Sequence, residues 1–221
     1  MPETPLTNAI NALTAYANTV TGASDTTLSD AVESLVDGYG GGGGGETLIH
    51  SWDFTSGLTD SVGGVTAVLH GATQSSSGIS FTASSNYVSF SQQIFEANTR
   101  IELDITSYDR QGTGHGKLFM STPDQGFAYR NTGYWGAYRN GGGSTLGWQM
   151  TEISDPTYFD GHTLKIAVNQ FGQCTFFNDN TEMFTINGLL MTGNFMLGSS
   201  NGSSAYNLLI TGLRIYSVPS A

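Results

Sequence analysis

The chain has 221 residues, of which 38% are hydrophobic and 11% are charged. Its 18 acidic residues outnumber its 7 Lys and Arg residues, which gives a formal net charge of −11. Because such a charge is repelled by phosphate backbones and anionic lipids, nucleic acid and membranes are excluded as expected partners. The length suits one β domain with a small appendage, and no apolar run is long enough to predict a membrane span.

Residues 1–39 have the apolar spacing of two short helices, each with a single apolar face. The apolar positions are Leu6, Ile10, Leu13, Ala17 and Val20 in the first, then Leu28, Val32, Leu35 and Val36 in the second. Two such helices bury too little apolar area to fold stably alone. We therefore expect a docking or oligomerisation segment at 1–39. The alternative is a helical hairpin folded onto the β domain.

Six consecutive glycines at positions 40–45 follow this segment. Glycine loses the most backbone freedom on ordering, so the run predicts a short flexible linker, set here at residues 40–46. The first residues of the chain lack the basic and apolar regions of a secretory signal. We therefore expect synthesis in the cytoplasm and no Sec-type export.

The combination of short helices and a glycine spacer resembles tail and fibre proteins of phages and prophages from Gram-positive and gut bacteria. The residues that carry this resemblance are Ala9, Ile10, Leu28, Ala31, Val32 and Leu35, followed by the glycines at 40–45. It implies a protein located in the virion, with residues 1–39 in contact with other virion proteins. It also implies a homo-oligomer, for which we expect a trimer.

From residue 47 onward, short runs of strand-forming residues are separated by turn residues, and no long helical pattern intervenes. The expected strands are 47–54, 64–70, 78–84, 86–91, 100–108, 116–122, 126–131, 163–170, 174–179 and 207–218. In one of them, Ile101, Leu103 and Ile105 alternate with polar residues, as in a strand with one buried face. This pattern predicts a mainly β chain with an antiparallel β-sandwich at 47–221.

Three segments resemble the concanavalin A-like jelly roll of laminin-G-type domains, legume lectins and many glucanases. They are the opening strand and turn at 50–64, the hairpin at 162–179, and the closing strand at 208–216. The resemblance covers residues 47 to 219 and implies a jelly-roll β-sandwich. It leaves the function open, because this fold carries enzymes, lectins and adhesion modules.

Aromatic residues crowd together between positions 127 and 159, beside amides and arginines. Sugars bind by stacking on exposed rings while polar groups take their hydroxyls. The carbohydrate-binding residues that we predict are Tyr129, Tyr134, Trp135, Tyr138, Trp148, Arg139 and Asn140. The alternative is that most of these rings form the core, because strands need large inward residues.

An enzymatic alternative depends on Glu102 and Asp104, which resemble the E-x-D-x-x-E signature of jelly-roll glucanases. Retaining hydrolysis needs two carboxyl groups about 5 Å apart, one of them protonated. The position of the second glutamate is Ser107, and Asp109 is out of register. We therefore predict that these acids lie on the solvated face of a strand and that the protein is not an enzyme.

The remaining polar motifs predict no cofactor and no metal. The four histidines share no ligand spacing, and Cys174 is the single cysteine. Residues 112–117 lack the full phosphate-loop pattern and predict a hairpin turn. The alternative is a structural calcium ion with Asp53 and Asp60 among its ligands.

The leading hypothesis is a non-enzymatic virion protein of the tail, fibre or decoration type. Its β-sandwich would attach to glycans on the host surface. The alternatives are a glycan-degrading enzyme and a purely structural decoration protein whose β domain binds no ligand.

Overall fold

The computed structural model describes residues 11, 13–16, 46–94, 96–110, 115–121, 125–139, 147–187, 195–198 and 206–219. The chain divides into two units, residues 1–47 with Ala221 and residues 48–220. In the first unit, Asn11 and residues 13–16 are helical. The remainder of the two expected helices and the glycines at 40–45 lie outside the described residues. Within the described part of the chain, no helix has the length and apolarity needed to cross a membrane.

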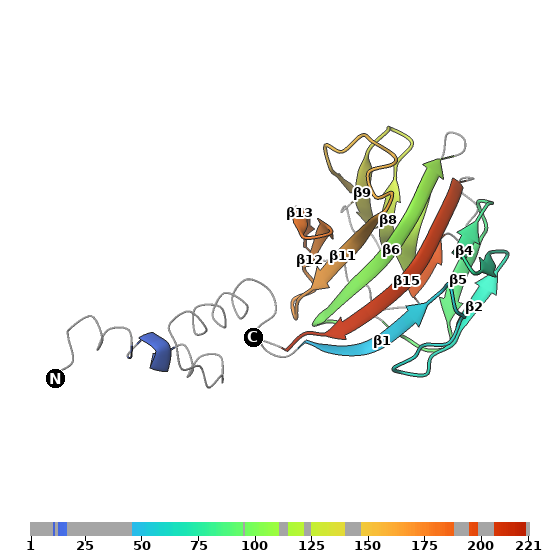
Figure 1. The fold of residues 1–221 in the computed structure, drawn as a ribbon. Coiled ribbons are helices and arrows are strands. Elements are labelled where there is room, and N and C mark those ends of the chain that lie inside the picture. The colour runs from blue at the N-terminus through green and yellow to red at the C-terminus, as the bar shows by residue number, and fades with distance from the viewer. Residues whose placement is uncertain are drawn as a thin grey trace. The chain divides into compact units, whose positions relative to one another are not determined.

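Strands dominate the rest of the described chain (Figure 1). They are β1 (Thr47–Asp53), β2 (Ala67–His70), β3 (Thr73–Ser75), β4 (Gly78–Phe81), β5 (Tyr87–Phe90), β6 (Thr99–Arg110), β7 (Gly116–Ser121), β8 (Gln125–Tyr129), β9 (Trp135–Arg139), β10 (Trp148–Met150), β11 (His162–Val168), β12 (Cys174–Asn178), β13 (Thr181–Ile186), β14 (Phe195–Gly198) and β15 (Tyr206–Ser217).

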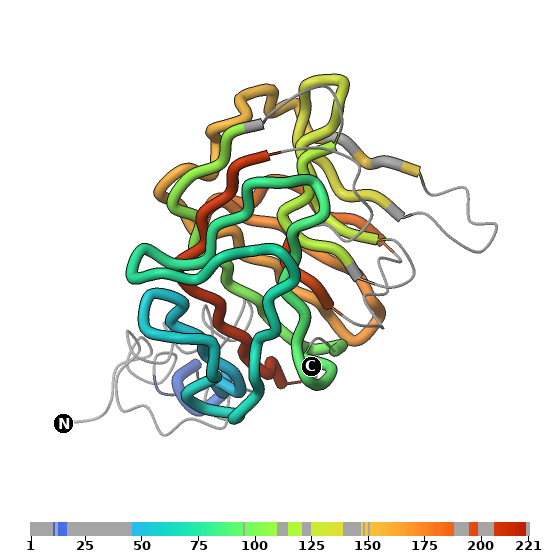
Figure 2. The backbone as a smooth tube through the Cα atoms, turned by 90° about the vertical axis from the view of Figure 1, so that its right-hand side faces the viewer, coloured from blue at the N-terminus to red at the C-terminus, as the bar shows by residue number. Residues whose placement is uncertain are grey.

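The strands form two antiparallel sheets that face each other. One sheet has the order β13-β12-β11-β6-β15-β4-β3, with β1 also paired to β15. The other has the order β10-β9-β8-β7-β14-β5-β2. In Figure 2, the green-cyan segments around β2 to β5 lie toward the viewer and close one side of the sandwich. The predicted mainly β, antiparallel sandwich is therefore confirmed.

The core fills the space between the sheets, and its side chains come from alternate strand positions. On β6, Ile101, Leu103 and Ile105 are buried, as the sequence pattern predicts. The Trp52 indole is also buried, and its Nε1–H donates to the Val65 carbonyl at 3.1 Å. On β12, Cys174 is fully buried, and this burial raises the pKa of its thiol to about 12.

Five strands were not predicted from the sequence: β3, β9, β10, β13 and β14. Two of them, β3 and β10, span three residues each and are too short to show a period. The segment in which we predict the sugar-binding residues Trp135, Tyr138 and Arg139 forms β9, Trp135–Arg139, which pairs with β8 along its whole length.

Candidate functional site

Most of the predicted sugar-binding rings are buried, which corrects the sequence-based site. Trp135 is 0% exposed, Tyr129 is 6% exposed and Tyr138 is 4% exposed. In the β8–β9 pair, Tyr129 lies opposite Trp135, and the Trp135 ring stacks on Phe127 with centroids 5.5 Å apart. Side chains alternate between the two faces of a strand, and at Trp135 and Tyr129 they point into the core. Neither ring therefore has an open face for a sugar.

Tyr138 is buried on the opposite face of the same sheet. It is the register partner of Gly126, whose neighbour Phe127 belongs to the core. The Lys117 ammonium lies over the Tyr138 ring, 5.0 Å from its centroid, and Lys117 itself is buried. This arrangement is a cation–π contact, which stabilises a buried ammonium.

For the predicted residues Trp148 and Arg139, the structure describes the backbone alone. In the backbone, Trp148 of β10 is the register partner of Tyr138, and Arg139 of β9 is the partner of Gln125. The side chains of Trp148 and Arg139, and the whole of Asn140, lie outside the part of the chain that the structure describes. Their role in sugar binding stays a prediction.

Tyr134 is the predicted ring that the structure places on the surface, where it is 41% exposed. It ends the turn between β8 and β9, which is closed by two backbone bonds. The Arg130 N–H donates to the Tyr134 carbonyl at 2.8 Å, and the Gly133 N–H donates to the Arg130 carbonyl at 2.9 Å. Gly133 adopts a φ of 92°, in the left-handed region that favours glycine. The exposed ring is therefore held on a defined turn.

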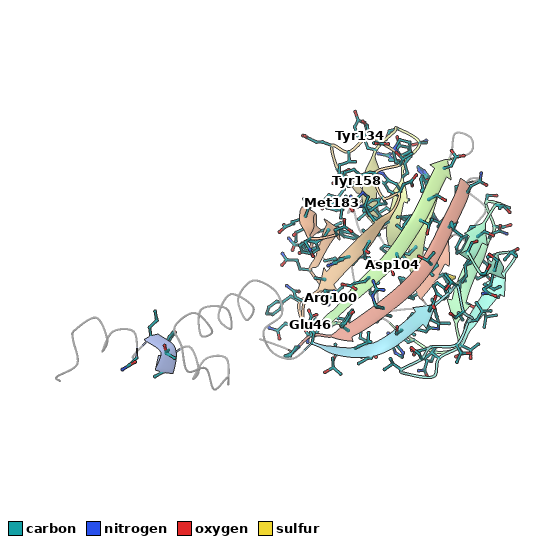
Figure 3. The ribbon with its side chains drawn as sticks, viewed as in Figure 1. Glu46, Arg100, Asp104, Tyr134, Tyr158 and Met183 are labelled. Atoms are coloured by element: carbon teal, nitrogen blue, oxygen red, sulfur yellow. The ribbon has the colours of Figure 1, made fainter. Side chains whose placement is uncertain are left out.

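The loop between β10 and β11 forms the second part of this surface. It is joined to the turn by bonds from the two buried rings: the Trp135 Nε1–H donates to the Asp155 carbonyl at 2.8 Å, and the Tyr129 hydroxyl donates to the Ser154 carbonyl at 2.6 Å. Tyr158, which is partly buried, follows in the same loop. Figure 3 shows Tyr134 and Tyr158 on the same side of the sandwich.

We call the group Arg130, Asn131, Tyr134, Asp155 and Tyr158 the Tyr134 surface. Asn131 is exposed, and its N–H donates to His115 Nδ1 at 3.4 Å. One Asp155 oxygen accepts from the Thr157 N–H and hydroxyl at 2.9 and 2.8 Å. The surface thus combines one exposed ring with guanidinium, amide and carboxylate groups, which is the set needed for sugar recognition.

Glu102 and Asp104, the carboxylates of the enzymatic alternative, belong to one ion-pair network around Arg214, and Figure 3 shows Asp104 on the eight-stranded sheet. The prediction that both acids lie on the solvated face is wrong for Glu102, which is 8% exposed because cationic side chains surround it. Glu102 contacts the Arg100 guanidinium, the Arg214 Nε at 2.9 Å and the Lys165 Nζ at 3.6 Å. Burial alone would raise the pKa of Glu102, but the Arg214 hydrogen bond and the neighbouring positive charges outweigh it and hold this pKa below its ordinary value. This environment opposes the protonated state that a general acid requires.

The two aspartates considered for calcium are surrounded by hydrogen-bond donors. Asp60 accepts from the Ser51, Val62 and Gly63 N–H groups at 2.7 to 2.9 Å, and from His50 Nδ1 at 2.6 Å. Asp53 accepts from Thr55 and Ser56. Among the described residues, no group of three or more His, Cys, Asp or Glu residues could hold a metal ion. Both aspartates fix turns.

The β-sandwich has an exposed aromatic side chain that the sequence-based site does not include. Phe171 is 78% exposed at the tip of the turn between β11 and β12. The sequence does carry a signal for it, because Asn169 and Gly172 flank it as turn residues, and a large ring inside such a turn has no core position to occupy.

No family model matches this sequence. No curated protein matches it either. Among solved structures, domain 4 of the GH43 extracellular arabinanase AbnA from Geobacillus stearothermophilus, in complex with arabinotriose, aligns at a TM-score of 0.53 with 17% identity, over 80% of this chain and 95% of that domain.

Two further structures are similar. Trypanosoma rangeli sialidase in complex with sialic acid aligns at a TM-score of 0.56 with 12% identity, over 79% of this chain and 31% of the sialidase. The botulinum neurotoxin serotype D binding domain aligns at 0.59 with 10% identity, over 79% of this chain and 49% of that chain. This chain thus spans about a third of the sialidase and half of the toxin domain. At these identities, the likenesses show the fold alone.

Proposed function

We propose that the β-sandwich is a glycan-binding module without catalytic activity, and that the Tyr134 surface contacts the sugar. The observation that carries this proposal is the Tyr134 ring, 41% exposed on a turn fixed by backbone hydrogen bonds. An exposed ring on a rigid support can stack on a sugar with little loss of conformational entropy on binding.

Two of the structural neighbours support the choice of ligand class. The arabinanase domain was solved with arabinotriose and the sialidase with sialic acid. A β-sandwich presents loops at the ends of its sheets, and the Tyr134 turn, which joins β8 to β9, is one of these loops. The ion-paired state of Glu102 supports a binding role over hydrolysis at that residue.

The wider role that we propose depends on the first 46 residues. The phage-like pattern of helices and glycine spacer supports a virion protein of the tail, fibre or decoration type. Residues 1–39 would dock on other virion proteins or join three copies, and the β-sandwich would attach to the host surface. Light scattering of the full chain against a chain lacking residues 1–45 tests this role. If both chains form particles with the same number of subunits, residues 1–45 do not direct assembly.

The glycan proposal is tested on an array of bacterial cell-wall and capsular polysaccharides and sialylated glycans. The full chain is compared with Tyr134→Ala, with Tyr134→Phe, which keeps the ring, and with Val68→Ala, which removes an exposed apolar side chain elsewhere. We expect Tyr134→Ala to weaken binding by about tenfold, while the two other variants bind like the original chain. A full chain that binds none of the glycans would favour the purely structural role.

A further inference from the structure

The turn between β11 and β12 displays a second aromatic ring on a tightly bonded support. Phe171 is 78% exposed, which makes it the most exposed of the large apolar side chains among the described residues. The Gly172 N–H donates to the Asn169 carbonyl at 3.1 Å, and Gly172 has a φ of 73°. A turn followed by a left-handed glycine is a common hairpin connection with one fixed geometry.

Side-chain amides further stabilise this turn. The Asn169 Oδ1 accepts from the N–H groups of Phe171 and Gln173, both at 3.0 Å. The Asn169 Nδ2 donates to Gln173 Oε1 at 3.1 Å, and the Gln173 Nε2 donates to Asn187 Oδ1 at 2.9 Å. The backbone that carries Phe171 is therefore fixed by a connected row of three amides.

We propose that the Phe171 turn, defined as Asn169, Phe171, Gln173 and Asn187, is a second glycan-binding site, selective for neutral sugars. The Phe171 ring would stack on the apolar C–H face of a sugar, and the amides of Gln173 and Asn187 would exchange hydrogen bonds with its hydroxyls. The choice of a neutral ligand follows from the turn as a whole, because residues 169–173, which join β11 to β12, include no charged side chain. The inference rests on the proposed glycan-binding function.

A sugar fits this turn better than a protein partner does. A stable protein interface buries roughly 800 Å² on each partner around an apolar centre. Among the described residues, the turn at 169–173 carries one ring, Phe171, beside the polar side chains of Asn169, Gln170 and Gln173. One ring and a few amides match one or two sugar units instead.

The Phe171 turn and the Tyr134 surface lie toward opposite ends of β6. Val168, next to the turn, pairs with Thr99 at the start of β6, whereas Tyr108 near its end contacts the Trp135 ring at 4.9 Å. Thr99 and Tyr108 are nine positions apart on β6, which corresponds to about 30 Å. At this separation the two sites can be altered independently. Two sites on one domain would also increase the avidity for long polysaccharides.

The test measures retention of the full chain on dextran, mannan, galactan and arabinan, which are neutral, and on sialylated glycans. The variants are Phe171→Ala, Phe171→Trp, which keeps a stacking ring, and Tyr134→Ala. Thermal unfolding verifies that each variant is folded. We expect Phe171→Ala to weaken binding to a neutral polysaccharide about tenfold, and Phe171→Trp to retain it.

Four outcomes would overturn the inference. If Phe171→Ala binds the neutral polysaccharides as the original chain does, while Tyr134→Ala is weakened, the Tyr134 surface alone is the site. If the full chain binds only sialylated glycans, the glycan-binding function stands and the neutral site does not. If Phe171→Ala abolishes self-association in sedimentation velocity and leaves sugar binding unchanged, the ring contacts a second copy. A chain that binds no glycan of either class contradicts both proposals.

Discussion

Arg214 of β15 holds Asp104 of β6 through two parallel hydrogen bonds of 2.7 and 2.8 Å. The fit depends on Gly212, because a Cβ atom there would lie 2.6 Å from Asp104 Oδ2. Thr163 of β11 adds a hydroxyl donor to the same carboxylate at 2.8 Å. Three strands that are distant in the sequence are thereby joined on one sheet face.

Replacing Arg214 by Lys should lower the free energy of unfolding by about 1 to 3 kcal/mol. The charge is kept, but the two-point contact with Asp104 is lost, since an ammonium cannot reproduce the planar fork of a guanidinium. Urea denaturation followed by tryptophan fluorescence measures the change. Lys165→Arg is the matched control, because it keeps a cation at 3.6 Å from Glu102 without altering Asp104. Identical urea midpoints for Arg214→Lys and the original chain would contradict this prediction.

Acid should destabilise the β-sandwich through Glu102 and Asp60. Burial alone would raise the pKa of both groups, but hydrogen bonds and nearby positive charges hold each pKa below its ordinary value in the folded state. The stabilisation is therefore complete above the unfolded-state pKa, near 4, and is lost as the pH falls through the lower folded-state pKa. Unfolding midpoints measured from about pH 6 to pH 3 should fall most steeply below pH 4.

The contribution of Glu102 to this pH dependence can be isolated by substitution. Glu102→Gln should be less stable near neutral pH and should show a shallower loss of stability in acid. Glu152→Gln, which alters an exposed side chain, serves as the control. A slope for Glu102→Gln that equals the slope of the control would show that this carboxylate does not contribute.

Gly126→Ala should destabilise the seven-stranded sheet by about 1 to 3 kcal/mol. A Cβ atom at Gly126 would overlap the Phe119 carbonyl oxygen and approach Met120 Cα to 3.0 Å. Both are backbone atoms of β7, which cannot move without breaking the ladder. Gly57→Ala is the control, because its Cβ would meet no atom within 4 Å. Thermal unfolding of both variants gives the comparison, and equal melting temperatures would contradict the prediction.

Trp135→Phe separates the structural role of this ring from the sugar-binding role first predicted for it. The smaller ring leaves a cavity and removes the indole donor to the Asp155 carbonyl, so we expect a loss of about 2 to 4 kcal/mol in stability. The Tyr129 hydroxyl bond to the Ser154 carbonyl still holds the loop between β10 and β11. Below the unfolding transition, the glycan affinity of the folded fraction should therefore stay within about threefold of the original. A large loss of affinity in a fully folded variant would restore Trp135 to the binding site.

The sequence predicted the fold class through local patterns that the structure preserves. The alternation of Ile101, Leu103 and Ile105 identified the buried face of β6 correctly, because period two is a property of the strand itself. The pairing of Arg214 with Glu102 could not be predicted in this way, since the two residues are 112 positions apart. Only the order of strands in the sheet brings them together.

The candidate site was harder to predict because aromatic composition does not distinguish a core ring from a surface ring. Trp135 and Tyr134 are adjacent in the sequence, yet one is 0% and the other 41% exposed. The hairpin partner decides which of the two points inward. The turn residues around Phe171 predict its exposure, but a search for clusters of aromatic residues does not detect an isolated ring.

The burial of Cys174 makes its thiol a built-in reporter of unfolding. Its raised pKa, about 12, leaves almost no thiolate at neutral pH, and its position between β11 and β13 shields it from reagents. A thiol-specific dye should therefore react only with molecules in which this part of the sheet has opened. The labelling rate would then follow the opening of the β11–β12–β13 edge in the intact chain, and no cysteine has to be introduced for the measurement.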